Sequence, residues 1–137
     1  MSEDENPGLV VSRPARILLA EDDRILRRAG EVTLSKKGYA VIVAVDGEDA
    51  LSKAREHRPD LILLDVIMPK LGGFEVLTRL KADPETRDIP VIMLSNLGEA
   101  SDVRDAIERG ARAYLVKSSV RPEQLAAKVA ETLAHPE

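Results

Sequence analysis

Apolar residues in this chain gather in five short runs, separated by longer stretches in which apolar residues recur at helical spacing. The runs lie at residues 16–20, 39–45, 61–64, 91–94 and 113–116 and are rich in Val, Ile and Leu. Runs that are apolar at adjacent positions are typical of strands covered on both faces. The pattern therefore predicts an α/β domain with a doubly wound, five-stranded parallel sheet and five helices.

The stretches after the runs carry the helical patterns. The first is marked by Ile25, Ala29 and Val32 and is closed by Gly38. The later ones are marked by Ala50, Leu51 and Ala54 on one face, by Phe74, Leu77 and Leu80 at three-residue spacing, and by Leu125, Val129 and Leu133 at four-residue spacing. Between the last two, Ala100, Val103, Ala106 and Ile107 are expected to face inward. Residues 1–14 are mostly polar and predict a flexible arm, so the domain is expected to span residues 15–137.

Length and composition narrow the class further. The chain has 137 residues, no cysteine, three aromatic residues and a formal net charge of -4 with both signs dispersed. It is long enough for the core of one domain, and it cannot form disulfides or thiolate metal sites. The apolar runs are far shorter than the roughly 20 residues of a membrane span, and the acidic start is unlike a signal peptide. We expect a cytoplasmic protein with no membrane span and no direct nucleic-acid partner.

The third run organises the chain, because its apolar residues lead directly into Asp65 and Pro69 then ends it. In a doubly wound sheet, the loops beyond the carboxyl ends of the strands form the crevice where chemistry takes place. A lone aspartate at a strand end is most often only a turn cap. Here the residues after the other runs are also polar: Glu21, Asp22 and Asp23, then Asp46, then Ser95 and Asn96, then Lys117 and Ser118.

Acids from separate loops at one rim repel one another unless a cation compensates them. Carboxylates with a backbone carbonyl and water are the ligands that suit Mg2+. We therefore predict a Mg2+ site made by Asp22 with help from Glu21, by Asp65 and by the backbone carbonyl of Ile67. For Glu21 and Asp22 taken alone, a helix N-cap is the simpler interpretation.

Lys117 and Ser95, taken singly, are typical of a surface lysine and a turn hydroxyl. Beside Mg2+ they complete a phosphoryl site, since a carboxylate can be the nucleophile while a cation and a hydroxyl bind the phosphoryl oxygens. Asp65 is the predicted nucleophile, because it stands alone at the end of the central run.

Five motifs carry a resemblance to a known family. They lie at residues 17–23, 46–51, 59–69, 72–77 and 110–117, in the order and at the spacing of that family. From about residue 16 to residue 133, the chain resembles the receiver domain of two-component response regulators, of the stand-alone type.

The resemblance implies a flavodoxin-like fold with strand order 2-1-3-4-5. It implies that a histidine kinase or histidine phosphotransfer protein phosphorylates Asp65, that Glu21 and Asp22 bind Mg2+, and that Ser95 and Lys117 contact the phosphoryl group. It also implies that Tyr114 is a switch residue, and that a downstream protein binds the face made by the fourth helix, fifth strand and fifth helix. Such a chain is a phosphoacceptor signalling domain rather than an enzyme, although it catalyses its own phosphorylation and dephosphorylation.

Two positions depart from the family pattern. Asn96 stands where a small residue is common, and there it either crowds the approach to Asp65 or hydrogen-bonds a water. Ser118 stands where proline is common, which disfavours a cis peptide because cis costs ~2.5 to 4 kcal/mol without proline.

Three other functions are weighed against this prediction. The first is an interaction module that is never phosphorylated, although no acid or lysine of the pattern is missing. The second is an aspartyl-phosphate hydrolase, which would need a second aspartate where Ile67 stands. The third is a flavin carrier, which the acidic first loop disfavours.

Overall fold

The computed structural model describes residues 13–96 and 100–136. The flexible arm expected at residues 1–14 falls mostly outside these described residues. The strands are β1 (Arg16–Ala20), β2 (Ala40–Ala44), β3 (Leu61–Asp65), β4 (Val91–Ser95) and β5 (Ala113–Val116). The helices are α1 (Arg24–Lys36), α2 (Gly47–His57), α3 (Gly73–Ala82), α4 (Ala100–Glu108) and α5 (Pro122–Ala134), with a short 3-10 turn η1 at Lys117–Ser119.

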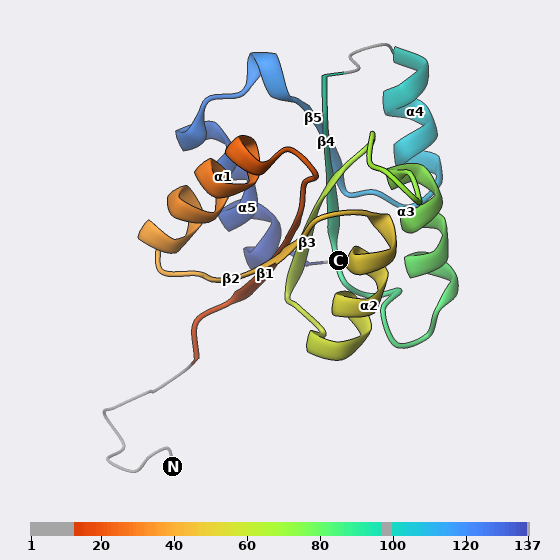
Figure 1. The fold of residues 1–137 in the computed structure, drawn as a ribbon, viewed down its shortest axis with the longest axis horizontal. Helices are drawn as coiled ribbons and strands as arrows, with labels where there is room; N and C mark the ends of the chain where they lie inside the picture. Colours follow the sequence, from red (N-terminus) through yellow and green to blue (C-terminus); the bar gives the residue numbers. More distant parts are fainter. Residues whose placement is uncertain (1–12, 97–99, 137) are drawn as a thin grey trace.

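The five strands form one parallel sheet in the order β2-β1-β3-β4-β5. Figure 1 shows α1 and α5 covering one face of the sheet and α2, α3 and α4 covering the other. Helices on both faces follow from parallel pairing, because each strand must be joined to the next by a crossover. The predicted fold class and strand order are therefore confirmed.

β3 lies in the middle of the sheet and its five residues are all buried. Ile62 and Leu64 pack into the core beneath α2 and α3, while Leu61 and Leu63 pack into the core beneath α1 and α5. Each of these branched side chains contributes roughly 1.5 to 3 kcal/mol when fully buried. The strand that ends at Asp65 is thus anchored from both faces.

The first helix forms where it was predicted, but its marker residues are not its buried face. Ile25 is 80% exposed, and Ala29 is also exposed. The helix instead approaches the sheet through Gly30, where an added Cβ would lie 2.9 Å from Leu19 Cδ2, and through the fully buried Leu34. A glycine gives no hydrophobic signal, so the apolar spacing that marks this helix does not identify the face that meets the sheet.

The inward positions predicted for α4 are wrong in part. Ala106 is fully buried, but Ile107 is 47% exposed and Ala100 is exposed. This helix covers the side of the sheet near its β5 edge, where it packs on β5. A helix at such an edge buries a narrow stripe of small residues, which leaves its larger side chains open.

Candidate functional site

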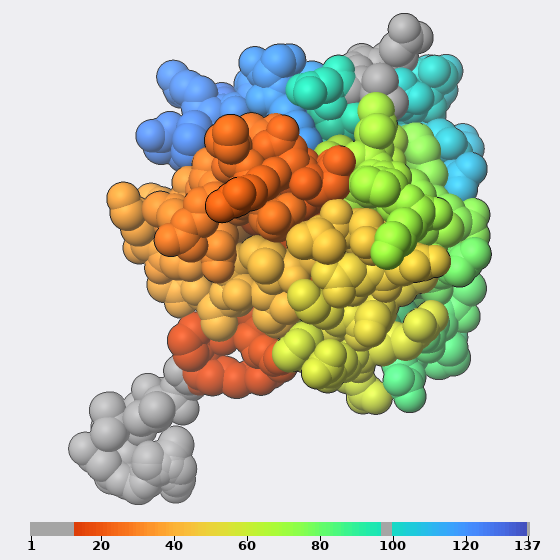
Figure 2. Space-filling model, viewed as in Figure 1, coloured from red at the N-terminus to blue at the C-terminus, as the bar shows by residue number. Residues whose placement is uncertain are grey.

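The predicted polar residues meet at the carboxyl ends of the strands. Asp65 and Ser95 are the last residues of β3 and β4, Glu21 and Asp22 follow β1, and Lys117 follows β5. Figure 2 shows the start of α1 (orange) lying next to both the segment after β3 (yellow-green) and the C-terminal part of the chain (blue). The parallel sheet therefore brings these distant residues to one end of the molecule.

Asp65 is buried, with only 6% of its surface exposed. Its Oδ2 accepts a hydrogen bond from Lys117 Nζ at 2.9 Å, and its Oδ1 accepts one from the amide of Ile67 at 3.3 Å. The amide of the next residue, Val66, donates to the carbonyl of Leu94 at 3.1 Å, which continues the ladder beyond β3. The carboxylate is therefore held by charge and by backbone at the mouth of the sheet.

Lys117 also pairs with Glu21, which is 4% exposed. One ammonium group thus joins two buried carboxylates that are 44 residues apart in sequence. Burial raises the pKa of Glu21, the hydrogen bonds from Lys117 and from the amide of Asp23 oppose this, and the charge of Asp65 adds to the increase. Burial alone would lower the pKa of Lys117, but its hydrogen bonds to Glu21 and Asp65 and their charges raise it overall.

The loop between β1 and α1 is shaped by Asp23 and by Arg27, of which only Arg27 was not named from the sequence. Asp23 is the N-cap of α1, and its Oδ1 accepts from the amides of Ile25 and Leu26 at 2.9 and 3.0 Å. Arg27 Nη1 donates to the carbonyls of Glu21 and Asp22 at 2.8 and 3.2 Å. The capping interpretation thus applies to Asp23, and the side chains of Glu21 and Asp22 do not cap α1. A basic residue one turn into the helix was the available signal for Arg27.

Gly73, the first residue of α3, lets that helix start directly against the site. A Cβ at this position would lie 2.2 Å from the carbonyl oxygen of Asp65, far below any real contact. The amide of Gly73 donates to the carbonyl of Val66 at 2.8 Å. The second glycine of the pair at 72–73 is therefore required by the close approach of two backbones.

Ser95 and Tyr114 are coupled across the edge of the sheet. Ser95 is fully buried and Tyr114, on the neighbouring strand, is partly buried. Burial raises the pKa of the Tyr114 hydroxyl, a side-chain hydrogen bond with Ser95 lowers it, and the charges of Asp102 and Asp65 raise it further. The phenol therefore interacts both with the hydroxyl at the end of β4 and with the field of Asp65.

The remaining predicted positions lie around the same rim. The side chain of Ile67 is 59% exposed, and its peptide lies beside the Asp65 carboxylate through the amide contact described above. Asn96 and Ser118 are both exposed. The described residues contain no cis peptide bond, so the expectation of a trans bond at Ser118 is confirmed.

The acidic triad of Glu21, Asp22 and Asp65 can hold a metal ion. One carboxylate oxygen from each residue lies within 4.8 Å of the others. Two of the acids are buried and the third is exposed, and an all-oxygen donor set of this kind fits a hard divalent cation. The carboxylate of Asp22 has no side-chain hydrogen bond or ion pair among the described residues, so a cation meets no competitor there.

The fold and the site together define a class: a flavodoxin-like α/β domain with an acidic triad and a lysine at the carboxyl end of its central strand. Residues 17–130 match the response regulator receiver domain family. The chain belongs to this family, and so it is a receiver domain of a two-component system.

Solved structures agree with this assignment. The chemotaxis protein CheY4 of Vibrio cholerae is 31% identical, with a TM-score of 0.81, and the match covers 86% of this chain and 98% of that one. A CheY-like response regulator receiver domain protein of Methanospirillum hungatei is 27% identical with a TM-score of 0.82, covering 90% and 96% of the two chains.

Longer relatives share the same domain. The DNA-binding dual master transcriptional regulator RpaA of Synechocystis sp. is 41% identical over 111 residues, which are 81% of this chain and 46% of that protein. The gliding motility regulatory protein of Myxococcus xanthus is 44% identical over 111 residues, which are 14% of its length. The chain thus spans less than half the length of these relatives. Within residues 13–96 and 100–136, no helix is both long and apolar enough to cross a membrane.

Proposed function

We propose that this receiver domain accepts a phosphoryl group on Asp65 from the phosphohistidine of a histidine kinase or histidine phosphotransfer protein. The observation that carries the proposal is the shared pairing of Lys117 with two buried carboxylates, Asp65 and Glu21, beside the exposed Asp22. Burying two carboxylates on one lysine costs solvation energy, and a purely structural site would be served better by apolar packing. The arrangement is suited to a reaction in which charge is added at Asp65.

The transfer needs one bond to form and one to break. A carboxylate oxygen of Asp65 forms a bond to phosphorus while the bond from phosphorus to the donor imidazole nitrogen breaks, and the imidazole keeps the electron pair. Lys117 stays beside the new acyl phosphate and compensates its added charge. Ser95, at the end of the neighbouring strand, donates a hydrogen bond from its hydroxyl to a phosphoryl oxygen.

We propose Mg2+ as the required cation, held by Asp22, Glu21 and Asp65 with the backbone carbonyl of Ile67. When bound, Mg2+ neutralises negative charge on the transferred phosphoryl oxygens. The chain's own part is to separate Glu21 from Lys117. Lys117 then interacts with the phosphoryl group alone. Hydrolysis of the acyl phosphate restores the starting pair, so the domain acts as a reversible signal and not as an enzyme on a separate substrate.

The phosphodonor protein docks beside this site on the first turns of α1. Ile25 and Leu26 are 80% and 47% exposed, directly after the N-cap that follows the acidic loop. Exposed branched side chains that adjoin a reactive centre favour a protein partner over a small donor. The exposed side of the first turns of α1 thus gains a role.

Output passes through the face formed by α4, β5 and α5 to a downstream protein. When Ser95 turns to the phosphoryl group, its hydrogen bond with Tyr114 is lost and the aromatic ring changes position on β5. The phosphoryl group acts through its different interaction with these two arrangements. The domain itself has no direct role in nucleic-acid binding, and DNA recognition in a relative such as RpaA is a property of that longer protein.

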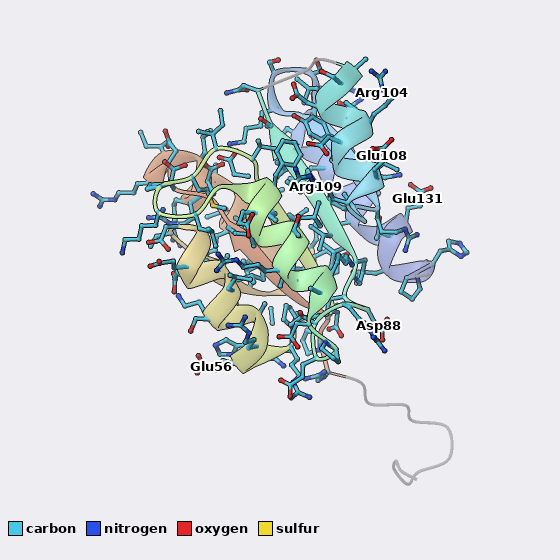
Figure 3. The ribbon with its side chains drawn as sticks, turned by 90° about the vertical axis from the view of Figure 1, so that its right-hand side faces the viewer. Glu56, Asp88, Arg104, Glu108, Arg109 and Glu131 are labelled. Atoms are coloured by element: carbon cyan, nitrogen blue, oxygen red, sulfur yellow. The ribbon has the colours of Figure 1, made fainter. Side chains whose placement is uncertain are left out.

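The test is phosphorylation by acetyl phosphate with Mg2+, followed by intact mass measurement. The unmodified chain is expected to gain one phosphoryl group, and Asp65→Asn to gain none. Asp88→Asn, at an exposed acid at the opposite end of the molecule (Figure 3), is the matched control and should label normally.

Two results would contradict the proposal. Equal labelling of Asp65→Asn at an acid-stable linkage would place the nucleophile elsewhere. An unmodified chain that gains no mass from acetyl phosphate or from a phosphohistidine donor would instead be an interaction module that works without phosphorylation.

A further inference from the structure

A second charged site lies at the opposite end of the sheet from Asp65, where the strands begin. The connections before β4 and β5 border a pocket there, together with the end of α5. We call it the basal pocket, and its lining includes Lys81, Arg87, Asp88, Gly110, Arg112 and Pro136. Figure 3 places Asp88 at this end of the molecule, away from the upper end of α4.

Arg112 lies where β5 begins. Its amide donates to the carbonyl of Val91 at 2.8 Å, and its Nη2 donates to the carbonyl of His135, just after α5. Its Nη1 is buried and has no hydrogen-bond partner among the described residues. A buried, unpaired donor on a charged group is destabilising, so Arg112 lacks an acceptor that an anion would supply.

Lys81 lies on the other side of the pocket. Its Nζ donates to the carbonyls of Arg87 and Ile89 at 3.0 and 2.8 Å, which leaves one of its three protons for another acceptor. Its aliphatic stem passes Gly110, where an added Cβ would lie 3.0 Å from Lys81 Cγ. Burial lowers the pKa of Lys81, the charge of Asp88 opposes this and the charge of Arg112 adds to it. Lys81 and Arg112 are thus close enough to repel.

The charges of the basal pocket are unbalanced. Three cationic side chains, Lys81, Arg87 and Arg112, face one carboxylate, that of Asp88. None of the three cations forms an ion pair within the part of the chain that the structure describes. We propose that the basal pocket binds a small oxyanion of the carboxylate or phosphate class, with Arg112 and Lys81 as its donors.

Binding carries a specific structural consequence. Nη1 of Arg112 is covered in this structure, so the guanidinium must turn toward the pocket to meet the anion. Because Nη2 is anchored on the carbonyl of His135, this turn shifts the chain after α5. The basal pocket is independent of phosphorylation at Asp65. If the pocket binds no anion, the proposed function is unaffected.

The test uses the full chain labelled with 15N, in EDTA so that no metal can hold phosphate at the acidic triad. Sodium phosphate is titrated against sodium chloride at matched ionic strength. We expect saturable amide shifts at Ile89, Gly110, Arg112 and His135 with phosphate alone. Removing a guanidinium that binds an anion should weaken binding roughly 10- to 100-fold.

Arg112→Gln is the test variant, and Arg104→Gln is the control, because Arg104 is an exposed arginine on α4 (Figure 3). If Arg112→Gln does not fold, Lys81→Gln provides the same comparison. Shifts that do not saturate, that chloride reproduces, or that remain equally strong in the test variant would overturn the proposal.

A second experiment identifies the source of the oxyanion. The chain itself carries carboxylates at Glu3, Asp4, Glu5 and Glu137. If one of these occupies the basal pocket, changing all four to their amides moves the Arg112 amide signal without phosphate and tightens phosphate binding. If the signal and the affinity stay the same, the ligand is an anion from solution. Either result requires the saturable phosphate site, and its absence in both chains refutes the pocket.

Discussion

Replacing Lys117 by Met tests whether this lysine occupies the cation position of the acidic triad. Lys117 Nζ contacts Asp65 Oδ2 at 2.9 Å and also pairs with Glu21, and the three side chains are only 18%, 8% and 6% exposed. Methionine keeps the length and apolar stem of the lysine but removes its charge. Two buried carboxylates are then left without compensation.

The magnitude follows from this burial. Removing one partner of a buried ion pair costs about 3 to 5 kcal/mol, so we expect the metal-free variant to melt roughly 10 to 20 °C lower. The affinity for Mg2+ is expected to change in the opposite direction. In the unmodified chain, Mg2+ must first separate Lys117 from Glu21. Breaking such a charged hydrogen bond costs about 1.5 to 3 kcal/mol, so Mg2+ should bind the variant ~10- to 100-fold more tightly.

The assay is thermal unfolding in EDTA and in saturating MgCl2, with a Mg2+ titration of both proteins. Tighter binding adds about 1.4 to 2.7 kcal/mol of stabilisation by the metal, so the variant should gain more from Mg2+ than the unmodified chain. Lys53→Met is the control, since Lys53 pairs with Asp49 on α2 at 3.3 Å, outside the triad. Unchanged or weaker Mg2+ affinity in Lys117→Met would refute the idea that the lysine competes with the metal.

The other predictions concern the metal, the output and the phosphodonor. Asp22→Asn should weaken Mg2+ binding more than Glu21→Gln, because Asp22 offers an unpaired carboxylate while Glu21 must first leave Lys117; equal, negligible losses in a titration would contradict this. With beryllofluoride and Mg2+, amide signals should shift across residues 98–117 as well as around Asp65. Ser95→Ala should reduce the distant shifts while Mg2+ affinity stays nearly unchanged. Shifts confined to the site in the unmodified chain would exclude transmission through Ser95 and Tyr114. Ile25→Ala should slow transfer from a phosphohistidine protein at least several-fold without changing labelling by acetyl phosphate. Ile107→Ala, at an exposed isoleucine on α4, is the control and should leave both rates unaltered. Equal transfer rates for the two variants would exclude α1 as the docking surface.

Much of the fold could be predicted from the sequence, because a strand buried on both faces leaves a continuous apolar run. Residues 61–64 show this, since all of them proved fully buried. The faces of the outer helices were harder. α1 approaches the sheet through Gly30 and leaves Ile25 in solvent, because close contact between a helix and a strand depends on a missing side chain as much as on an apolar one.

The candidate site could be placed from the sequence for a topological reason. Parallel strands bring their carboxyl ends to one edge, so Asp65, Glu21 and Lys117 had to lie near one another. The pairing of Lys117 with Glu21, across 96 residues, could not be predicted in the same way. It depends on side-chain conformation in a partly buried space, which neither apolar spacing nor position after a strand specifies.

The position of Asp65 in the sheet has a consequence for local stability. β3 is fully buried between two other strands, whereas β5 is a shorter edge strand with only one of its four residues buried. Local opening is least frequent in such a central strand and more frequent at an edge. Under the proposed phosphorylation, the added charge therefore lies on the strand of the sheet that opens least. Both edge strands, β2 and β5, are less buried than β3, so a response to that charge is expected at the edges of the sheet rather than at its centre.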